Sequence, residues 1–315
     1  MTINTVKLLA LGAAKRVTLF NQMKQLFSEA GILLEVTSVE LNDNFYPISS
    51  VGDVIAGPKF TDDTFQSFLG NELRNRGANS LAFMDAAIPS LSTFSGRDFG
   101  SGRVISSSVK GANIALSKQI TADFCFANGI RHPQIFNFEK KPARGIPLIA
   151  KPIEGFGSKG ISYFSSNDFE EHAEKCDGTH IIQEFIKGPE TTHDLYIDQD
   201  LNFISASRDR LSVTGGEVDH CLVRASTEKE KLVFNKLART GLFRGPITVQ
   251  TIMRADECFM IEVNARLGGG VTGSIQAGFP VLQRWAKDSI GVELPEKEFN
   301  PIEMKRCYRD FYRSV

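Results

Sequence analysis

The sequence predicts a small parallel α/β domain followed by a larger α+β region. Two observations predict this order. Short apolar runs alternate with helix-like stretches through residues 6–85, which is the rhythm of a parallel sheet. Beyond residue 145, strand-like runs follow one another more closely, and a glycine-rich segment joins the first two of them.

The first part of the chain reads as strand and helix in turn. Three apolar runs predict strands, at residues 6–12, 32–41 and 80–85. Helices are expected after the first run, to about residue 26, and over residues 64–77. The segment at 94–103, rich in glycine and arginine, is typical of a loop near a boundary. We therefore expect a first domain at residues 1–105 and a second at 106–315.

The second part is expected to have two lobes, at about 106–180 and 181–315. One helix is predicted within residues 110–136, where Gly129 is a plausible C-cap, and another over residues 167–178. Further apolar runs predict strands, mostly in antiparallel hairpins, at residues 146–154, 160–166, 180–188, 193–210, 246–254 and 258–266.

Composition excludes several classes of function. Lys and Arg number 36 and Asp and Glu 37, so net charge gives no argument for binding nucleic acid or a membrane surface. The chain contains no long apolar run for a spanning helix, and its first apolar run resembles a strand more than a signal peptide. Five widely spaced cysteines without a CxxC pair indicate free thiols in a reducing compartment, so we expect a cytoplasmic protein.

The glycine-rich segment, KPIEGFGSKGI at residues 151–161, suits a backbone that approaches phosphate closely. A dinucleotide-binding loop needs a helix after the last glycine, but the residues that follow are β-prone. The P-loop pattern fails because Ile161 follows Gly160. A kinase reading fails because the only DFG, at 98–100, precedes the loop. A hairpin without a ligand and a glycine flap over ATP both stay open at this point.

A metal site is predicted near the last of these strands. Glu262 and Asn264 are two residues apart, so both side chains point to one face. If residues 255–257 form the turn, Gln250 lies directly opposite Glu262, with Cβ atoms about 5 Å apart. One carboxylate and two amide oxygens on one face suit the hard cation Mg²⁺.

Four stretches then occur in a familiar order: PLIAKPIEGFGSKGI, IIQEFIKGPETTHDLYID, GPITVQTIM and FMIEVNARLGGG. In this order they resemble the ATP-grasp superfamily, and in particular its carbamoyl-phosphate-synthase-like branch in a single-copy form. The resemblance covers about residues 105–290, and the preceding α/β part resembles the pre-ATP-grasp domain of such proteins. It implies a two-lobed ATP-grasp domain whose glycine loop folds over ATP.

The resemblance also implies a set of nucleotide contacts. Lys151 and Lys118 match the lysines that contact the nucleotide, and Glu190 matches the acid that binds the ribose hydroxyls. Adenine is expected against a hinge strand. The expected flap over the phosphates consists of Glu154, Gly155, Phe156, Gly157, Ser158 and Gly160. The expected hinge consists of Gln183, Glu184, Phe185 and Ile186.

The family pattern places Gln250, Glu262 and Asn264 around two Mg²⁺ ions, for which Mn²⁺ can substitute. Gln250 departs from the pattern, because many members carry Asp or Glu there. Arg266 is expected to neutralise a transferred phosphoryl group, and Arg210 to neighbour the acceptor site, with Arg208 as a weaker candidate. The GGG at 268–270 is either a close approach to substrate or a turn.

The activity that the resemblance implies is ATP-dependent ligation. A small-molecule carboxylate becomes an acyl phosphate, ADP leaves, and an amine or thiol displaces phosphate. The partners are then small-molecule carboxylate and amine substrates, with neither nucleic acid nor membrane, and a homodimer is possible. Two alternatives stay open: a nucleotide-binding regulatory protein without turnover, and a phosphotransferase with the same ATP site.

Overall fold

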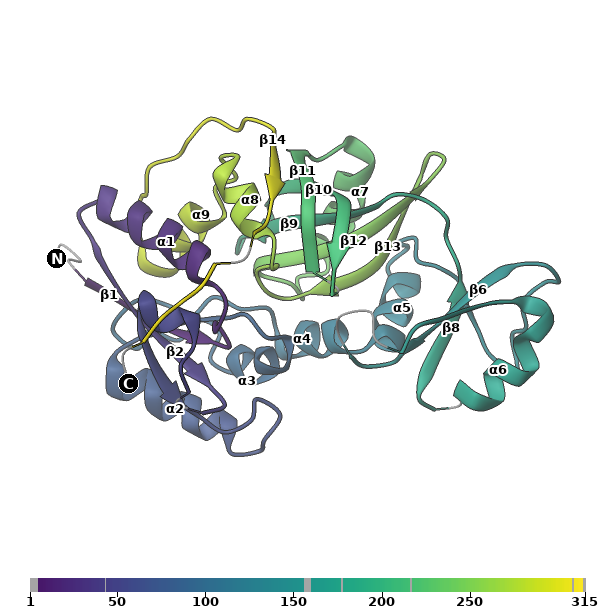
Figure 1. The fold of residues 1–315 in the computed structure, drawn as a ribbon, viewed down its shortest axis with the longest axis horizontal. Coiled ribbons are helices and arrows are strands. Elements are labelled where there is room, and N and C mark those ends of the chain that lie inside the picture. Colours follow the sequence, from purple (N-terminus) through teal and green to yellow (C-terminus); the bar gives the residue numbers. More distant parts are fainter. Residues whose placement is uncertain are drawn as a thin grey trace.

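The computed structural model describes residues 5–42, 44–155, 160–176, 178–215, 217–307 and 309–313. In this part of the chain the strands form a parallel four-stranded sheet, a six-stranded sheet and a second four-stranded sheet. Figure 1 shows them from left to right as the N-terminal layer, the central sheet and a projecting lobe. The parallel N-terminal part and the antiparallel sheets confirm the predicted fold class.

The parallel sheet has the order β3-β2-β1-β4. Its strands are β1 (Thr5–Leu11), β2 (Leu33–Glu40), β3 (Asp53–Ala56) and β4 (Asn79–Ala82). Alternate residues of β1 pack on α1 (Val17–Glu29) and on α2 (Phe65–Arg76), so the two helices cover opposite faces. Strand β3 was not predicted, because its four half-exposed or exposed residues give no apolar run.

The central sheet is antiparallel, in the order β13-β12-β9-β10-β11-β14. Its strands are β9 (Glu190–Ile197), β10 (Phe203–Thr214), β11 (Glu217–Ala225), β12 (Gly245–Arg254), β13 (Glu257–Asn264) and β14 (Ile302–Lys305). Helix α7 (Glu228–Arg239) packs on one face and begins with a capping box of Thr227 and Glu230. Helices α8 (Val271–Gln276) and α9 (Val281–Ile290) pack on the other.

The projecting lobe contains the glycine-rich segment. Its antiparallel sheet has the order β5-β8-β6-β7, from β5 (Ile135–Phe136), β6 (Pro147–Pro152), β7 (Ser162–Ser165) and β8 (His180–Glu184). Helix α6 (Phe169–Cys176) covers it and shares a small core of its own with the sheet. The segment therefore joins two strands, β6 and β7, and no helix follows it as a dinucleotide site requires.

Short helices connect these parts: α3 (Ile88–Ser92), α4 (Val109–Leu116), α5 (Lys118–Ala127) and the 3₁₀ turns η1 (Pro47–Ser50), η2 (Asp85–Ala87) and η3 (Ser166–Asp168). The helix predicted within residues 110–136 is confirmed as α5, with left-handed Gly129 just after its end, but a second helix, α4, precedes it because the helical run is interrupted at Ser117. That residue is extended, and its hydroxyl accepts a hydrogen bond from the Ile120 N–H and caps α5. Among the described residues, no helix is both long and apolar enough to cross a membrane.

Candidate functional site

The β12–β13 hairpin brings the three predicted metal ligands together. Gln250 lies opposite Glu262, as the sequence predicts, and the Asn264 Nδ2 donates a hydrogen bond to Glu262 Oε1 at 2.9 Å. The turn is shorter than predicted, however, since Arg254 pairs with Glu257 around two residues. An extra residue, Ile261, stands between the pairs Thr251–Met260 and Gln250–Glu262, and this β-bulge restores the predicted pairing.

The donor chemistry of this hairpin fits a magnesium site. Glu262 supplies one carboxylate, while Gln250 and Asn264 offer amide oxygens, and hard Mg²⁺ takes oxygen ligands and completes its shell with phosphate and water. The described residues contain no group of three His, Cys, Asp or Glu that could hold a metal. With only one formal negative charge, these three residues would leave most of the neutralisation of a bound Mg²⁺ to other ligands.

Lys151, on β6 of the projecting lobe, lies near Glu262 of this hairpin and near a second lysine, Lys118. Burial lowers the pKa of Lys151 on β6, the charge of Glu262 opposes that shift, and the charge of Lys118 adds to it. These groups are therefore near neighbours. Lys118 begins α5, and its Nζ donates to the Gly155 carbonyl at 3.1 Å. Lys151 thus has one carboxylate, Glu262, and a second cation, Lys118, in its surroundings.

The glycine loop is described only at its ends. Gly155 and Gly160 have φ of +129° and +70°, conformations that favour glycine. Glu154 and Gly155 are exposed at the end of β6. The other three predicted flap residues, Phe156, Gly157 and Ser158, lie outside the described residues.

The predicted adenine hinge follows β8. Gln183 and Ile186 are buried. The backbone N–H groups of Glu184 and Phe185 already donate to the carbonyls of Gln134 and Pro147, both at 2.9 Å. An adenine at this hinge would therefore have to be read by the remaining backbone groups.

Arg254, which was not predicted from the sequence, connects the predicted hinge to the β12–β13 hairpin. It is the last residue of β12, donates to the Glu184 carboxylate, and stacks over the Phe259 ring at 4.7 Å. Because Glu184 ends a strand of the lobe, this ion pair joins the lobe to the central sheet. A hydrophobic run that ends in arginine gives no sequence signal for such a contact.

Glu190 and Arg210, predicted for ribose and acceptor respectively, form an ion pair across β9 and β10. Burial lowers the pKa of Arg210, and the negative charge of Glu262 opposes that shift. Arg210 therefore lies near Glu262. A ribose hydroxyl at Glu190 would have to share that carboxylate with Arg210.

A second missed residue, His132, lies on the same side of the lobe. Burial lowers its pKa to about 4, a hydrogen bond with the Pro133 carbonyl opposes the shift, and the charge of Lys151 adds to it. His132 is therefore neutral at physiological pH. It lies between Gly129 and Pro133 in a stretch that reads as a loop, so the sequence gives no sign that it lies near Lys151.

Arg266 lies just beyond β13 and reaches the N-terminal part of the chain. Its Nη2 donates to Asp85 Oδ2 at 2.5 Å, and Nη1 donates to the Leu267 carbonyl at 3.1 Å. Asp85 was missed as a site residue. Its place after β4, a parallel strand, was the available signal, because ligands of α/β sheets bind beyond the carboxyl ends of strands.

Arg208, the weaker arginine candidate, is a buried structural residue. It makes two hydrogen bonds to Asp194, at 2.7 and 2.9 Å, and only 1% of its surface is exposed. A Cβ at Gly270 would overlap the Arg208 guanidinium, and one at Gly269 would lie 2.9 Å from Arg16 Nη1. The GGG segment is thus a turn packed against arginine side chains, and Arg306 also donates to the Gly269 carbonyl.

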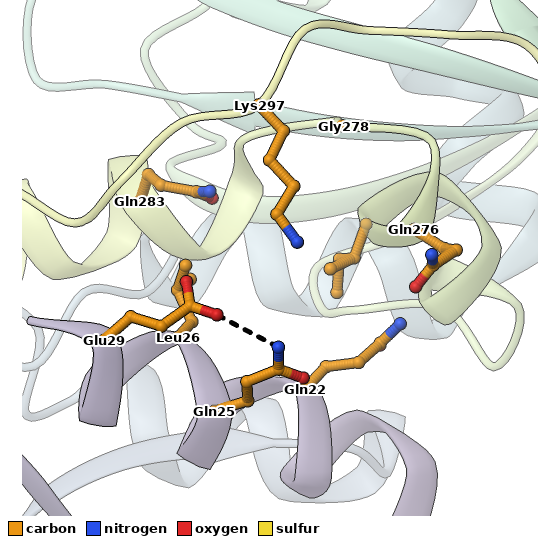
Figure 2. Close-up of a pocket in the computed structure, with 9 residues that line it drawn as sticks. Gln22, Gln25, Leu26, Glu29, Gln276, Gly278, Gln283 and Lys297 are labelled. Carbon is orange, nitrogen blue, oxygen red and sulfur yellow. Dashed lines mark hydrogen bonds between the residues drawn. The ribbon is translucent and has the colours of Figure 1, made fainter.

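A separate cavity lies between α1 and the α8–α9 segment, away from all of these residues. Figure 2 shows it lined largely by amides, among them Gln22, Gln25 and Gln276, with Lys297 above. None of the predicted nucleotide or metal residues lines it. The site described above is therefore defined by converging charges and by the hairpin rather than by this cavity.

Comparisons with known proteins bear on the family and the fold of this chain. A family model described as an ATP-grasp domain matches residues 115–270. A comparison with curated proteins finds no match. Among solved structures, the fold is similar to N5-carboxyaminoimidazole synthetase from Staphylococcus aureus in complex with ADP. The TM-score is 0.73 at 15% identity, over 96% of this chain and 82% of that one.

Two other similar structures come from different enzymes. An L-amino acid ligase from Bacillus licheniformis has a TM-score of 0.66 at 18% identity, over 91% of this chain and 75% of that one. Biotin carboxylase from Campylobacter jejuni, in complex with β-γ-ATP, has a TM-score of 0.66 at 16% identity, over 92% of this chain and 72% of that one. At such identities the likeness shows the fold alone.

Proposed function

Because this chain belongs to the ATP-grasp superfamily, we propose that it is an ATP-dependent ligase that joins a small-molecule carboxylate to an amine or a similar nucleophile. The observation that carries the proposal is the hairpin that brings Gln250, Glu262 and Asn264 together, with Lys151 near Glu262 and Lys118 near Lys151. Phosphoryl transfer needs cations and metal-binding oxygens at one place, and these residues supply both. The ligases among the structurally similar proteins support the same class of reaction.

The proposed reaction has two steps. A carboxylate oxygen of the substrate attacks the γ-phosphorus of ATP, and the bond to the β-γ bridging oxygen breaks, which gives an acyl phosphate and ADP. The nucleophile's nitrogen then attacks the acyl carbon, phosphate leaves, and the nitrogen loses a proton. No nucleophilic side chain is needed, so the protein's work is to position charges and exclude water.

Each residue has a defined part in this proposal. Lys151 and Lys118 bind phosphate oxygens, the glycine loop covers them, and residues 183–186 and Glu190 receive adenine and ribose. Gln250, Glu262 and Asn264 would hold two Mg²⁺ ions, or Mn²⁺ in their place, which supply charge neutralisation at the phosphates. Arg210 neutralises charge on the acceptor, and Arg266 neutralises charge on the transferred group.

The wider setting is also proposed. All five cysteines are free thiols, three of them buried, which fits a reducing, cytoplasmic environment. Residues 1–105 and 106–315 are proposed as the two domains. We propose small-molecule partners only, and a homodimer as a possible assembly.

The test is to incubate the protein with Mg²⁺-ATP, a library of small carboxylates and hydroxylamine, and to measure ADP, AMP and hydroxamate. ADP together with a hydroxamate for one acid is the expected result and identifies the acid. AMP would mean adenylation and contradict the proposal. ADP without any hydroxamate would favour a phosphotransferase, and Mg²⁺-ATP binding without any product would favour a regulatory protein.

A further inference from the structure

The contact between Arg266 and Asp85 crosses from the central sheet to the N-terminal part of the chain. The two residues are 181 positions apart, and their side chains are only 15% and 5% exposed. Asp85 opens η2, the turn that closely follows β4, while Arg266 lies two residues beyond Asn264. The carboxylate therefore reaches the edge of the proposed phosphoryl-transfer site from a different sheet.

The backbone of Arg266 is held firmly in place. Its N–H donates to the Asn264 carbonyl at 2.8 Å, and its own carbonyl accepts from the Thr248 hydroxyl at 2.9 Å. The side chain, by contrast, has several rotatable bonds between this backbone and the guanidinium. Apart from its bond to the Leu267 carbonyl, the hydrogen bond to Asp85 fixes where the guanidinium lies.

A second buried ion pair, between Arg208 and Asp194, serves as an example of a purely structural one. Arg208 makes two hydrogen bonds to Asp194, and the Ser274 hydroxyl donates a third to that carboxylate at 2.6 Å. Arg266 and Asp85 make only one. Among the described residues, Arg266 Nε and Asp85 Oδ1 are buried without a hydrogen-bond partner. The Arg266–Asp85 pair thus has one donor and one acceptor that are not hydrogen-bonded. An ion pair with a purely structural role is expected to have all its buried polar atoms hydrogen-bonded.

A third buried donor lies close to this pair. Arg266 and Arg244 line one small pocket together with apolar residues such as Leu81, Ile88 and Leu91. Arg244 Nε is likewise buried without a partner among the described residues. Two arginines at this pocket therefore each have a buried donor without a partner.

We propose that Asp85 is a positioning residue: it orients the Arg266 guanidinium toward the transferred phosphoryl group, so the N-terminal part of the chain completes the phosphoryl-transfer site. This inference rests on the proposed function, which gives Arg266 its role. A guanidinium held by one carboxylate oxygen is pre-oriented yet retains donors for a phosphoryl oxygen. Without Asp85 the long side chain would have to be ordered during the reaction itself.

The test measures the affinity for Mg²⁺-ADP with and without aluminium fluoride, which mimics the phosphoryl group in transfer. The variants are Asp85→Asn, Asp85→Glu, Arg266→Ala and the double variant Asp85→Asn/Arg266→Ala. The control is Asp288→Asn, which changes a carboxylate that accepts a hydrogen bond from Tyr196 at 2.9 Å, outside the site. Thermal unfolding checks that each variant is folded.

We expect Asp85→Asn to leave Mg²⁺-ADP affinity unchanged and to weaken the fluoride complex on the order of tenfold. Asp85→Glu should recover part of that loss, and the double variant should be no weaker than Arg266→Ala. The inference is overturned if the fluoride complex of Asp85→Asn matches the wild type, if both affinities fall alike, or if the two substitutions add. A wild-type protein that does not bind Mg²⁺-ADP would overturn the proposed function itself, and this inference with it.

Discussion

Burial lowers the pKa of Lys151, and the nearby charge of Glu262 opposes that shift. We predict that Lys151→Met and Glu262→Ala each reduce ADP formation by roughly 100-fold or more, because each removes a charge that the transfer step needs. Both side chains are partly exposed, so thermal unfolding should change little. Glu293→Ala is the control, since Glu293 is an exposed partner of Lys287. Retained turnover in folded Glu262→Ala would count decisively against the site.

Gly270 shows the cost of a single Cβ. The atom would overlap the guanidinium of Arg208, which two hydrogen bonds to Asp194 prevent from moving. We predict that Gly270→Ala lowers the free energy of unfolding by roughly 1–3 kcal/mol, measured by urea denaturation. In the matched variant Gly273→Ala, the new Cβ would meet the flexible Met304 side chain, so that variant should lose less. Equal decreases in the free energy of unfolding for the two variants would show that the Arg208 side chain can move to make room for the new Cβ.

At the scale of the element, the projecting lobe is the part best able to move. Its sheet and α6 share a core of six buried residues that is separate from the larger cores. Small cores open more readily than large ones. We predict that amide hydrogens of β6 and β8 exchange faster than those of β9 and β12, and that an Mg²⁺-bound ATP analogue slows exchange in β6 and at the hinge. If the nucleotide analogue leaves hydrogen exchange in the lobe unchanged, the lobe does not close over the nucleotide.

The elements also show how far the sequence could be read. Strands β6, β12 and β13 were predictable because long apolar runs bounded by glycine or charge have few alternatives. The bulge at Ile261 was not, because its extra residue is apolar like its neighbours and only pairing with β12 reveals it. The predicted pairing of Gln250 with Glu262 is therefore correct, although the turn from which it was predicted is one residue too long. The bulge makes up for that difference.

The site was predictable where local pattern governs and missed where tertiary contact does. Glu262 and Asn264 share a face because strand periodicity requires it. Asp85 had a signal in its place after a predicted strand, but its contact with Arg266, like that of Arg254 with Glu184, forms only when sheets distant in sequence pack together. The interruption at Ser117 is different, because its hydroxyl caps α5 through a local hydrogen bond.

At the scale of the whole molecule, the first 105 residues and the rest share their cores. One core cluster unites Leu9 and Leu69 with Phe234 and Val249, and another unites Phe20 and Phe27 with Trp285. If either the first 105 residues or the rest of the chain unfolded, core side chains of the other part would become exposed. We therefore expect these parts to unfold together, so that a buried group in the central sheet reports on the stability of both.

His193 is such a group. It is fully buried, and its two ring nitrogens hydrogen-bond to the hydroxyls of Ser207 and Thr251, each at 2.8 Å. Burial lowers its pKa to about 4; the charges of Glu230 and Asp194 oppose the shift, and those of Arg224 and Arg208 favour it. The folded protein therefore keeps His193 neutral at a pH where the unfolded chain binds a proton.

The sign of the pH effect follows from that difference. Between about pH 6.5, the ordinary histidine value, and pH 4, the unfolded state holds the extra proton, so the free energy of unfolding falls as the pH decreases. His193 contributes up to roughly 3 kcal/mol across this window. Urea denaturation at a series of pH values measures the slope, to which the lowered pKa of His132 adds with the same sign. In His193→Gln, which retains an amide donor and acceptor but cannot titrate, the slope should be distinctly shallower. A variant slope equal to the wild type would show that His193 does not govern acid stability.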